Sequence, residues 1–224
     1  MSFVSVAIDG PAGAGKSTIA RQIARQLGYL YVDTGAIYRT VGLYTLHKGA
    51  DPRSEEEVVP LLDNLQVSMK VESDGIQHMY LGSEDVTDQI REPEISRYAS
   101  AVSALPPVRD FLLDTQRELA QTQNVVMDGR DIGTVVLPQA TVKIFLTASP
   151  EVRAMRRWKE LQERGNSDRY EDVLQDVIQR DYDDSHREIA PLRQAEDAVL
   201  ADTSDLNLEE SIGLLLNIIK ERQG

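Results

Sequence analysis

The stretch DGPAGAGKST (Asp9–Thr18) decides the fold, because it places a glycine-rich loop between a strand and a helix. The loop fits the pattern G-x-x-x-x-G-K-S, in which backbone N–H groups converge on phosphate oxygens. Before it, the β-branched run FVSVAI predicts a buried parallel strand. After it, apolar residues recur every four positions in KSTIARQIARQLG, which predicts an amphipathic helix. Strand, loop and helix therefore follow in the order that phosphate binding requires.

Further strands alternate with helices along the rest of the chain. We expect strands at Tyr29–Gly35, Asn124–Gly133, Thr141–Ala148 and Ala198–Asp202. Helical patterns follow in AIYRTVGLYTLHKG, SPEVRAMRRWKELQERG and LEESIGLLLNIIKER. This alternation predicts an α/β domain with one central parallel sheet flanked by helices.

The segment QVSMKVESDGIQHMYLG interrupts this rhythm. Polar and apolar residues alternate on both sides of Asp74-Gly75, as expected for a β-hairpin. We therefore expect a small β-containing insert at residues 63–100, within a core domain formed by residues 1–62 and 101–224.

The composition narrows the function further. The 224 residues include no cysteine, which excludes disulfides and thiolate chemistry, and they carry a formal net charge of −13. Such a charge argues against non-specific binding to nucleic acid, which depends on clustered basic charge. No apolar run is long enough to span a membrane and no signal-peptide pattern precedes the first strand, so we expect a cytoplasmic protein. We also expect a monomer, although no pattern in the sequence tests the oligomeric state.

The glycine-rich loop predicts a binding site for a nucleoside triphosphate. Lys16 is placed to reach the β- and γ-phosphates, and the hydroxyl of Ser17 suits a Mg²⁺ ion. The residues expected to hold ATP are Gly10, Pro11, Ala12, Gly13, Ala14, Gly15, Lys16, Ser17 and Thr18.

The loop by itself does not distinguish a switch, a motor and a kinase. A GTPase would also carry a guanine-reading Asn-Lys-x-Asp run, which the sequence lacks, and a motor would end an apolar strand in two acids, where VVMDGR offers one. The chain instead carries scattered arginines, and arginine outnumbers lysine by 18 to six. Arginines at separate points suit a kinase that holds two phosphorylated substrates in line. They are Arg39, Arg109, Arg130, Arg180, Arg187 and a group within 151–164.

Three arginines of one predicted helix lie close together. Arg153, Arg156 and Arg157 are spaced i, i+3 and i+4, so they emerge on one helical face. Like charges there destabilise the helix unless an anion neutralises them. The alternative is a solvated surface face balanced by Glu151 and Glu160.

With these motifs the chain resembles the bacterial cytidylate (CMP) kinases, within the nucleoside monophosphate (NMP) kinases. The resemblance runs nearly end to end, through IDGPAGAGKST, DTGAIYR, SAVSALPPVR, MDGRDIGTVVLPQATVKIFL, RAMRRWKELQERG and QRDYDDSHREIAPL. It implies a phosphate-loop kinase in which the insert at 63–100 binds the NMP and a short helical lid lies at about 151–170. It also implies transfer of the γ-phosphoryl group of ATP to CMP or dCMP, with Mg²⁺ accompanying ATP.

The resemblance assigns three groups of CMP-binding residues, which hold the acceptor phosphate, read the cytosine, or contact the sugar and the reacting phosphates. In that order they are Thr34, Arg39 and Arg130; Ser100, Arg109 and Asp131; and Arg180 and Asp184, with Arg187 on the same helical face. The residues implied in catalysis are Lys16, Arg39, Arg130, Arg153, Arg157 and Arg180, of which Arg153 and Arg157 would belong to the lid.

The chemistry of the base agrees with this assignment. Cytosine presents an amino donor where uracil presents a carbonyl acceptor, so a carboxylate such as that of Asp131 attracts the first and repels the second. Arg109 would complement the ring N3 and O2 acceptors of cytosine.

No general base is required, because a phosphate oxygen of the acceptor is already ionised at neutral pH. We therefore expect none of the three histidines, His47, His78 and His186, to be catalytic, and we expect Tyr31, Tyr38 and Trp158 to serve packing. Two alternatives stay open, namely a phosphate-loop kinase for another small acceptor and an ATP-binding regulatory module.

Overall fold

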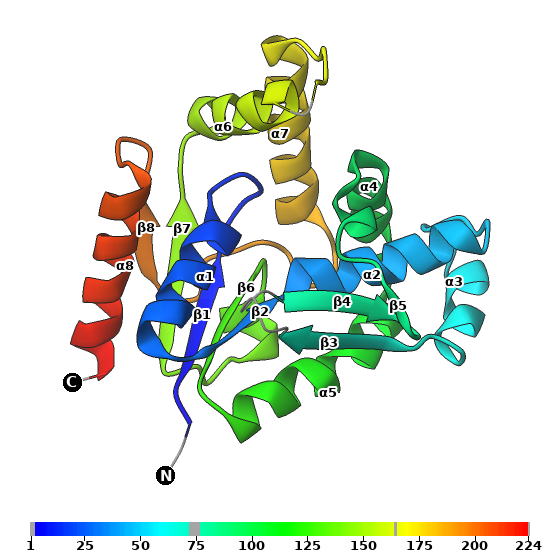
Figure 1. The fold of residues 1–224 in the computed structure, drawn as a ribbon, viewed down its shortest axis with the longest axis horizontal. Helices are drawn as coiled ribbons and strands as arrows, with labels where there is room; N and C mark the ends of the chain where they lie inside the picture. Colours follow the sequence, from blue (N-terminus) through cyan, green and yellow to red (C-terminus); the bar gives the residue numbers. More distant parts are fainter. Residues whose placement is uncertain (1–2, 72–76, 164, 224) are drawn as a thin grey trace. The chain divides into compact units, whose positions relative to one another are not determined.

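The computed structural model describes residues 3–71, 77–163 and 165–223. Its larger sheet has five strands in the order β2-β6-β1-β7-β8 (Figure 1). They are β1 (Ser5–Asp9), β2 (Leu30–Asp33), β6 (Val125–Gly129), β7 (Val142–Thr147) and β8 (Val199–Asp202). Parallel pairing joins β1 to β6 and β7, and β7 to β8. The parallel central sheet predicted from the sequence is confirmed.

The chain divides into two compact units, Met1–Tyr31 with Ala120–Gly224, and Val32–Leu119. The first unit holds most of the parallel sheet and the phosphate loop. Its helices are α1 (Lys16–Leu27), a π-helical turn η2 (Ile132–Val136), α6 (Pro150–Glu163), α7 (Tyr170–His186) and α8 (Leu208–Gln223). None of the helices in the described ranges combines the length and the hydropathy needed to cross a bilayer.

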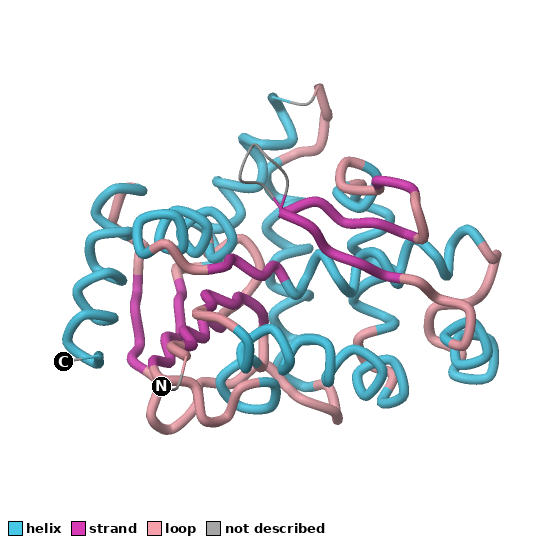
Figure 2. The backbone as a smooth tube through the Cα atoms, turned by 60° about the horizontal axis from the view of Figure 1, so that its bottom comes forward, coloured by secondary structure: helices cyan, strands magenta, loops and turns pink. Residues whose placement is uncertain are grey.

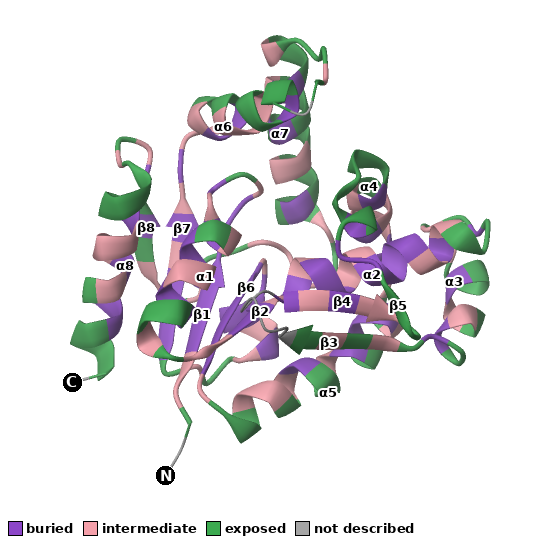
Figure 3. Ribbon diagram, viewed as in Figure 1, coloured by how far each residue is buried: buried purple, intermediate pink, exposed green. Residues whose placement is uncertain are grey.

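Apolar faces of α1 and α8 form one hydrophobic core with the strands. Ile19 and Ile23 of α1 and Leu215 and Ile219 of α8 are buried in the same cluster as Ile144 of β7. The spacing of four residues puts each helical pair on one face. β1 and β6 are the most deeply buried strands (Figure 3), so the segments that leave their carboxyl ends start from a rigid base.

The second unit contains a three-stranded antiparallel sheet in the order β3-β4-β5, and both sheets are drawn in magenta in Figure 2. Its elements are α2 (Thr34–His47), α3 (Glu55–Leu62), β3 (Val67–Val71), β4 (Gln77–Leu81), β5 (Glu84–Asp85), the 3₁₀ helix η1 (Gln89–Arg91), α4 (Pro93–Val102) and most of α5 (Pro106–Thr122). A Cβ on Gly42 of α2 would lie 2.9 Å from the backbone N of Ala99, so glycine lets α4 approach closely.

The predicted hairpin corresponds to the antiparallel pair of β3 and β4. Its predicted turn at Asp74-Gly75 lies outside the described residues. The compact unit that contains the hairpin, Val32–Leu119, is larger than the predicted insert at 63–100. The bounds of a compact unit do not show which residues bind an acceptor. The role of 63–100 as an NMP-binding insert stays a prediction.

Two predicted strands end earlier than expected. β2 ends at Asp33 rather than at Gly35, because the Asp33 carboxylate accepts the backbone N–H of Ala36 at 2.8 Å and thereby caps α2. β6 ends at Gly129 rather than at Gly133, because the chain after Gly129 turns into η2. In both cases the polar residues that follow the strand lie beyond its carboxyl end, which is where α/β proteins bind ligands.

Candidate active site

The phosphate loop leaves the carboxyl end of β1, the middle strand of the five. Gly10 has φ +150°, and a Cβ there would lie 1.9 Å from the carbonyl oxygen of Leu146 on β7, so only glycine fits. Gly15, at φ +88°, precedes α1, and no side chain of the described residues caps that helix. The N–H groups of its first turn are therefore available to an anion.

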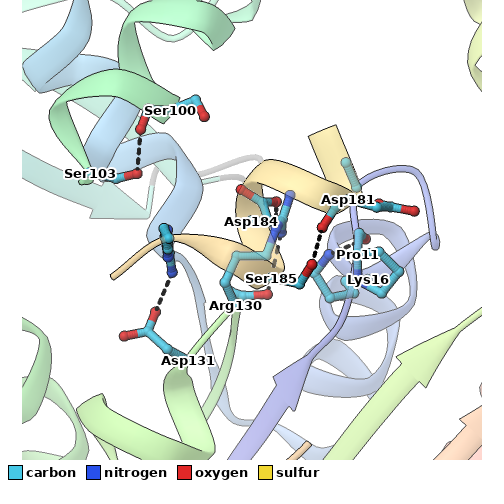
Figure 4. A network of polar contacts seen from close by, with 12 residues as sticks. Pro11, Lys16, Ser100, Ser103, Arg130, Asp131, Asp181, Asp184 and Ser185 are labelled. Carbon is cyan, nitrogen blue, oxygen red and sulfur yellow. Dashed lines mark hydrogen bonds and ion pairs between the residues drawn. The ribbon is translucent and has the colours of Figure 1, made fainter. Parts of the chain in front are cut away.

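Lys16 is buried beside this loop, where its Nζ donates to the carbonyl oxygen of Pro11 at 2.8 Å (Figure 4). Burial lowers the pKa of Lys16 to about 7, and the positive charge of Arg130 is the second largest cause. A phosphate group next to the ammonium would oppose both causes and favour the charged form. The site is thus prepared for an anion, as expected for a lysine that contacts the triphosphate.

Ser17 lies beside a buried acid that the sequence analysis did not select. Its hydroxyl donates to Oδ2 of Asp128 at 2.9 Å, and the phenol of Tyr31 donates to Oδ1 at 2.9 Å. Tyr31 was expected to serve packing alone, but it also orients this carboxylate. The feature of the sequence that could have identified Asp128 is its position at the end of an apolar strand. A single acid at such a position is only weak evidence for a functional residue.

Acidic residues hold the arginines that follow β6 and α7. Nε of Arg130 donates to Oδ2 of Asp184 at 2.7 Å (Figure 4). Arg187 lies 3.8 Å from Asp131. Burial would raise the pKa of Asp184, but the guanidinium groups of Arg130, Arg180 and Arg187 outweigh it and hold the pKa below its ordinary value. Predicted CMP-binding residues of this unit therefore form one ion-pair network.

A second acid missed by the sequence analysis is Asp9, the last residue of β1. Its two carboxylate oxygens accept the backbone N–H groups of Ile132 and Gly133, each at 2.7 Å. Burial raises the pKa of Asp9 to about 6, and these two hydrogen bonds oppose the rise. Asp9 thereby joins the start of the phosphate loop to the turn that follows Asp131.

The three arginines of α6 have different surroundings, although one face was predicted for all. Arg153 is buried, donates to the carbonyl oxygens of Ala148 at 2.8 Å and Ala12 at 3.1 Å, and forms a bidentate ion pair with Asp181. Arg156 also turns to the loop, donating to the carbonyl oxygen of Ala14 at 3.4 Å.

Arg157 is 37% exposed and pairs with Glu160 at 3.6 Å. Arg153 and Arg157 differ in burial because their partners differ. Carbonyl oxygens and Asp181 enclose Arg153, whereas the partner of Arg157 lies at the surface. Arg157 therefore has the surroundings of a surface residue, and Arg153 those of an internal one.

In the second unit, Thr34 and Arg39 lie at the start of α2. Thr34 is buried, and the Arg39 guanidinium donates to Oδ2 of Asp33 at 3.0 Å. Asp33 thus caps the helix with one oxygen and holds Arg39 with the other. This carboxylate was not singled out from the sequence.

Ser103 connects two residues predicted to read cytosine. Its hydroxyl donates to the carbonyl oxygen of Ser100 at 2.9 Å (Figure 4). Its own carbonyl oxygen accepts from Arg109 at 3.1 Å. The Arg109 guanidinium also lies over the ring of Tyr38, 5.8 Å from its centroid. Tyr38, expected to serve packing, therefore helps to orient Arg109.

The chemistry that follows is charge stabilisation without a nucleophilic side chain. A loop of open N–H groups, a buried lysine and arginines held by acids can bind phosphate groups and offset developing negative charge. Among the described residues, no cluster of three acids or histidines is placed to hold a metal ion by itself.

Comparisons with known proteins support this description. A family model described as cytidylate kinase matches residues 6–221. A cytidylate kinase from Caldicellulosiruptor bescii is 48% identical over 218 residues, covering 97% of this chain and 96% of that protein. One from Carboxydothermus hydrogenoformans is 49% identical over 214 residues, covering 96% of each. Among solved structures, an uncharacterized protein from Eubacterium ventriosum has the same fold, with a TM-score of 0.53 at 10% identity and coverage of 97% and 98%.

Proposed function

Because the chain belongs to the cytidylate kinase family, we propose that it transfers the γ-phosphoryl group of ATP to CMP or dCMP, giving ADP and CDP or dCDP. An oxygen of the acceptor phosphate attacks the γ-phosphorus, and the bond to the β-phosphate oxygen breaks. The observation that carries the proposal is the family match over residues 6–221, on a chain whose phosphate loop holds a buried lysine.

The donor side is the phosphate loop, Gly10–Thr18. Its N–H groups and the first turn of α1 would hold the triphosphate, with the ammonium of Lys16 at the β- and γ-phosphates. Arg153 supports the loop through the carbonyl oxygen of Ala12. In the lid proposed at about 151–170, Arg157 pairs with Glu160 at the surface, so it can turn toward the triphosphate when the lid closes.

Mg²⁺ would accompany ATP beside Ser17. The hydroxyl of Ser17 and the carboxylate of Asp128 lie 2.9 Å apart and offer the oxygen atoms that this hard cation prefers. When bound, the ion would supply positive charge that offsets the charge of the phosphate groups. The protein's own contribution is to hold these two oxygens in place, with Tyr31 fixing the carboxylate.

On the acceptor side, each residue would act in the role that the family resemblance implies. Thr34, Arg39 and Arg130 would hold the acceptor phosphate; Ser100, Arg109 and Asp131 would read the cytosine; and Arg180, Asp184 and Arg187 would contact the sugar and the reacting phosphates. Paired arginines give bidentate, charge-assisted bonds to phosphate. We further propose a cytoplasmic monomer without nucleic-acid partners, which the net charge of −13 supports.

One coupled assay of ADP release tests the proposal with CMP, dCMP, UMP, AMP and dTMP as acceptors. We expect release to depend on an added monophosphate and to be fastest with CMP or dCMP. Release without a monophosphate would favour a regulatory ATPase module. Equal rates with CMP and UMP would reject the roles of Asp131 and Arg109 in reading the base.

A further inference from the structure

Asp131 occupies the position that precedes the first turn of η2, where an aspartate usually caps the turn with its own side chain. In the described part of the chain, Asp131 makes no such capping hydrogen bond. The N–H groups of Ile132 and Gly133 are accepted instead by Asp9, which is 123 residues distant from Ile132 in sequence. Asp9 therefore accepts the N–H groups that a capping side chain would otherwise accept. The Asp131 carboxylate faces Arg187 instead.

We propose that Asp9 is a positioning residue for acceptor specificity: its buried carboxylate holds the turn at 131–133, and thereby directs the Asp131 carboxylate toward the acceptor base. This inference rests on the proposed function, because it assigns the specificity to Asp131. Asp9 itself touches neither substrate.

The surroundings of Asp9 leave little freedom for another arrangement. Its side chain is buried, and each oxygen has its own N–H donor at 2.7 Å, so the carboxylate has one orientation. A Cβ on Gly133 would lie 3.3 Å from Oδ2 of Asp9 and 3.1 Å from Cδ of Lys143. The absence of a side chain at Gly133 is thus part of the same contact.

The charge of Asp9 also points to a positioning role. Burial raises its pKa to about 6, so the carboxylate is ionised at neutral pH and can accept both bonds. Lys16 offsets its charge in part, and Asp131 opposes it. An asparagine would bury no charge, but its amide offers one acceptor oxygen for two N–H donors. The buried charge therefore lies at a position where only a carboxylate can accept a hydrogen bond from both backbone N–H groups.

The phosphate loop has anchors that do not depend on Asp9. Lys16 donates to the carbonyl oxygen of Pro11, and α6 arginines donate to the carbonyl oxygens of Ala12 and Ala14. The pairing of β1 with β6 ends at Asp9 and Gly129, before the turn begins. Loss of the Asp9 carboxylate should therefore disturb the acceptor side more than the ATP side.

The test compares kcat/KM for CMP and for UMP in the full chain and in Asp9→Asn. We expect the CMP-to-UMP ratio to fall about tenfold, the size associated with the loss of one charge-assisted hydrogen bond. We also expect the KM for CMP to rise more than the KM for ATP. A change in the folded fraction cancels in the ratio, so a purely structural role would leave it unchanged.

Two further variants complete the experiment. Gly133→Ala should shift the ratio in the same direction, because the new methyl group presses on Oδ2 of Asp9, and it keeps the test valid if Asp9→Asn does not fold. Ser211→Ala is the control, because it removes a side-chain hydrogen bond from buried Ser211 to the carbonyl oxygen of Asn207 at the start of α8, and it should leave the ratio unchanged.

The outcomes separate the inference from the proposed function. ADP release that does not depend on an added monophosphate would refute the proposed function, and this inference with it. A native chain that uses CMP and UMP equally would reject the role of Asp131 in reading the base, and with it this inference, but not the transfer of phosphate to CMP. A native chain that prefers CMP, with the ratio unchanged in Asp9→Asn and Gly133→Ala, would refute the inference alone.

Discussion

Replacing Asp181 by Asn should destabilise the unliganded protein strongly, because it leaves a buried guanidinium without its counter-charge. The Arg153 side chain is 3% exposed and that of Asp181 is 26% exposed. Removing one partner of a buried ion pair costs about 3–5 kcal/mol. Partial exposure of Asp181 and the remaining amide oxygen reduce this, so we expect a loss of about 2–3 kcal/mol in the free energy of unfolding.

Urea unfolding followed by circular dichroism measures this loss, and thermal unfolding should show a midpoint lower by roughly 5–10 °C. The matched control is Glu160→Gln, which breaks the ion pair between Arg157 and Glu160 at the surface of the same helix. That pair is worth below about 0.5 kcal/mol. Equal losses in the two variants would refute the reasoning, because they would show that burial does not decide the energy of these pairs.

The same variant also tests whether Arg153 supports the phosphate loop. Arg153 donates to the carbonyl oxygen of Ala12, so loss of its partner should raise the KM for ATP about tenfold while the KM for CMP changes less. Replacing both partners, with Arg153→Met and Asp181→Leu, should restore much of the stability but not the affinity for ATP. Recovery of both would show that the pair serves the fold alone.

Three other predictions concern charged groups of the same unit. Arg130→Lys should lower kcat about 100-fold with unchanged thermal stability, because the bidentate fork is lost while the charge stays, and an undiminished kcat would reject the role of Arg130. The pKa of Lys16 is lowered to about 7, so ATP binding should take up a proton at pH 8.5 but not at pH 6; calorimetry in buffers of different ionisation enthalpy that detects no uptake at pH 8.5 contradicts this. The pKa of Asp9 is raised from 3.8 to about 6, so the folded state binds the extra proton between these values. The native chain should therefore gain about 2 kcal/mol of stability relative to Asp9→Asn as the pH falls from 7 to 4, and a constant difference in urea unfolding would exclude the raised pKa.

The sequence predicts the fold well wherever local pattern and tertiary structure agree. Apolar runs such as TVKIFLTA are typical of buried strands, and the glycines at 10 and 15 match backbone that other residues rarely adopt. The ends of β2 and β6 were misplaced because polar residues there bond to neighbouring segments. The periodicity of hydrophobic residues along the sequence does not reveal such hydrogen bonds.

The candidate site was predicted only in part, and the missing part consists of acids. Arginines stand out in a chain that is poor in lysine, whereas four more aspartates among 37 acids do not. Asp9, Asp128 and Asp181 gain their roles from partners 123, 111 and 28 residues distant. Spacing in the sequence carries no information on these contacts, because each is made by the packing of separate elements.

The acids also explain how an arginine-rich site occurs in a chain of net charge −13. In each unit a carboxylate already holds a site arginine, as Asp33 holds Arg39 and Asp184 holds Arg130. An unpaired guanidinium would repel its neighbours and move freely in solvent, so a phosphate would have to order it on binding. A paired one is already in place, and a phosphate can share it with the carboxylate without leaving a buried charge alone. The acids therefore lower the cost of organising the arginines before either substrate arrives, which is the condition for electrostatic catalysis.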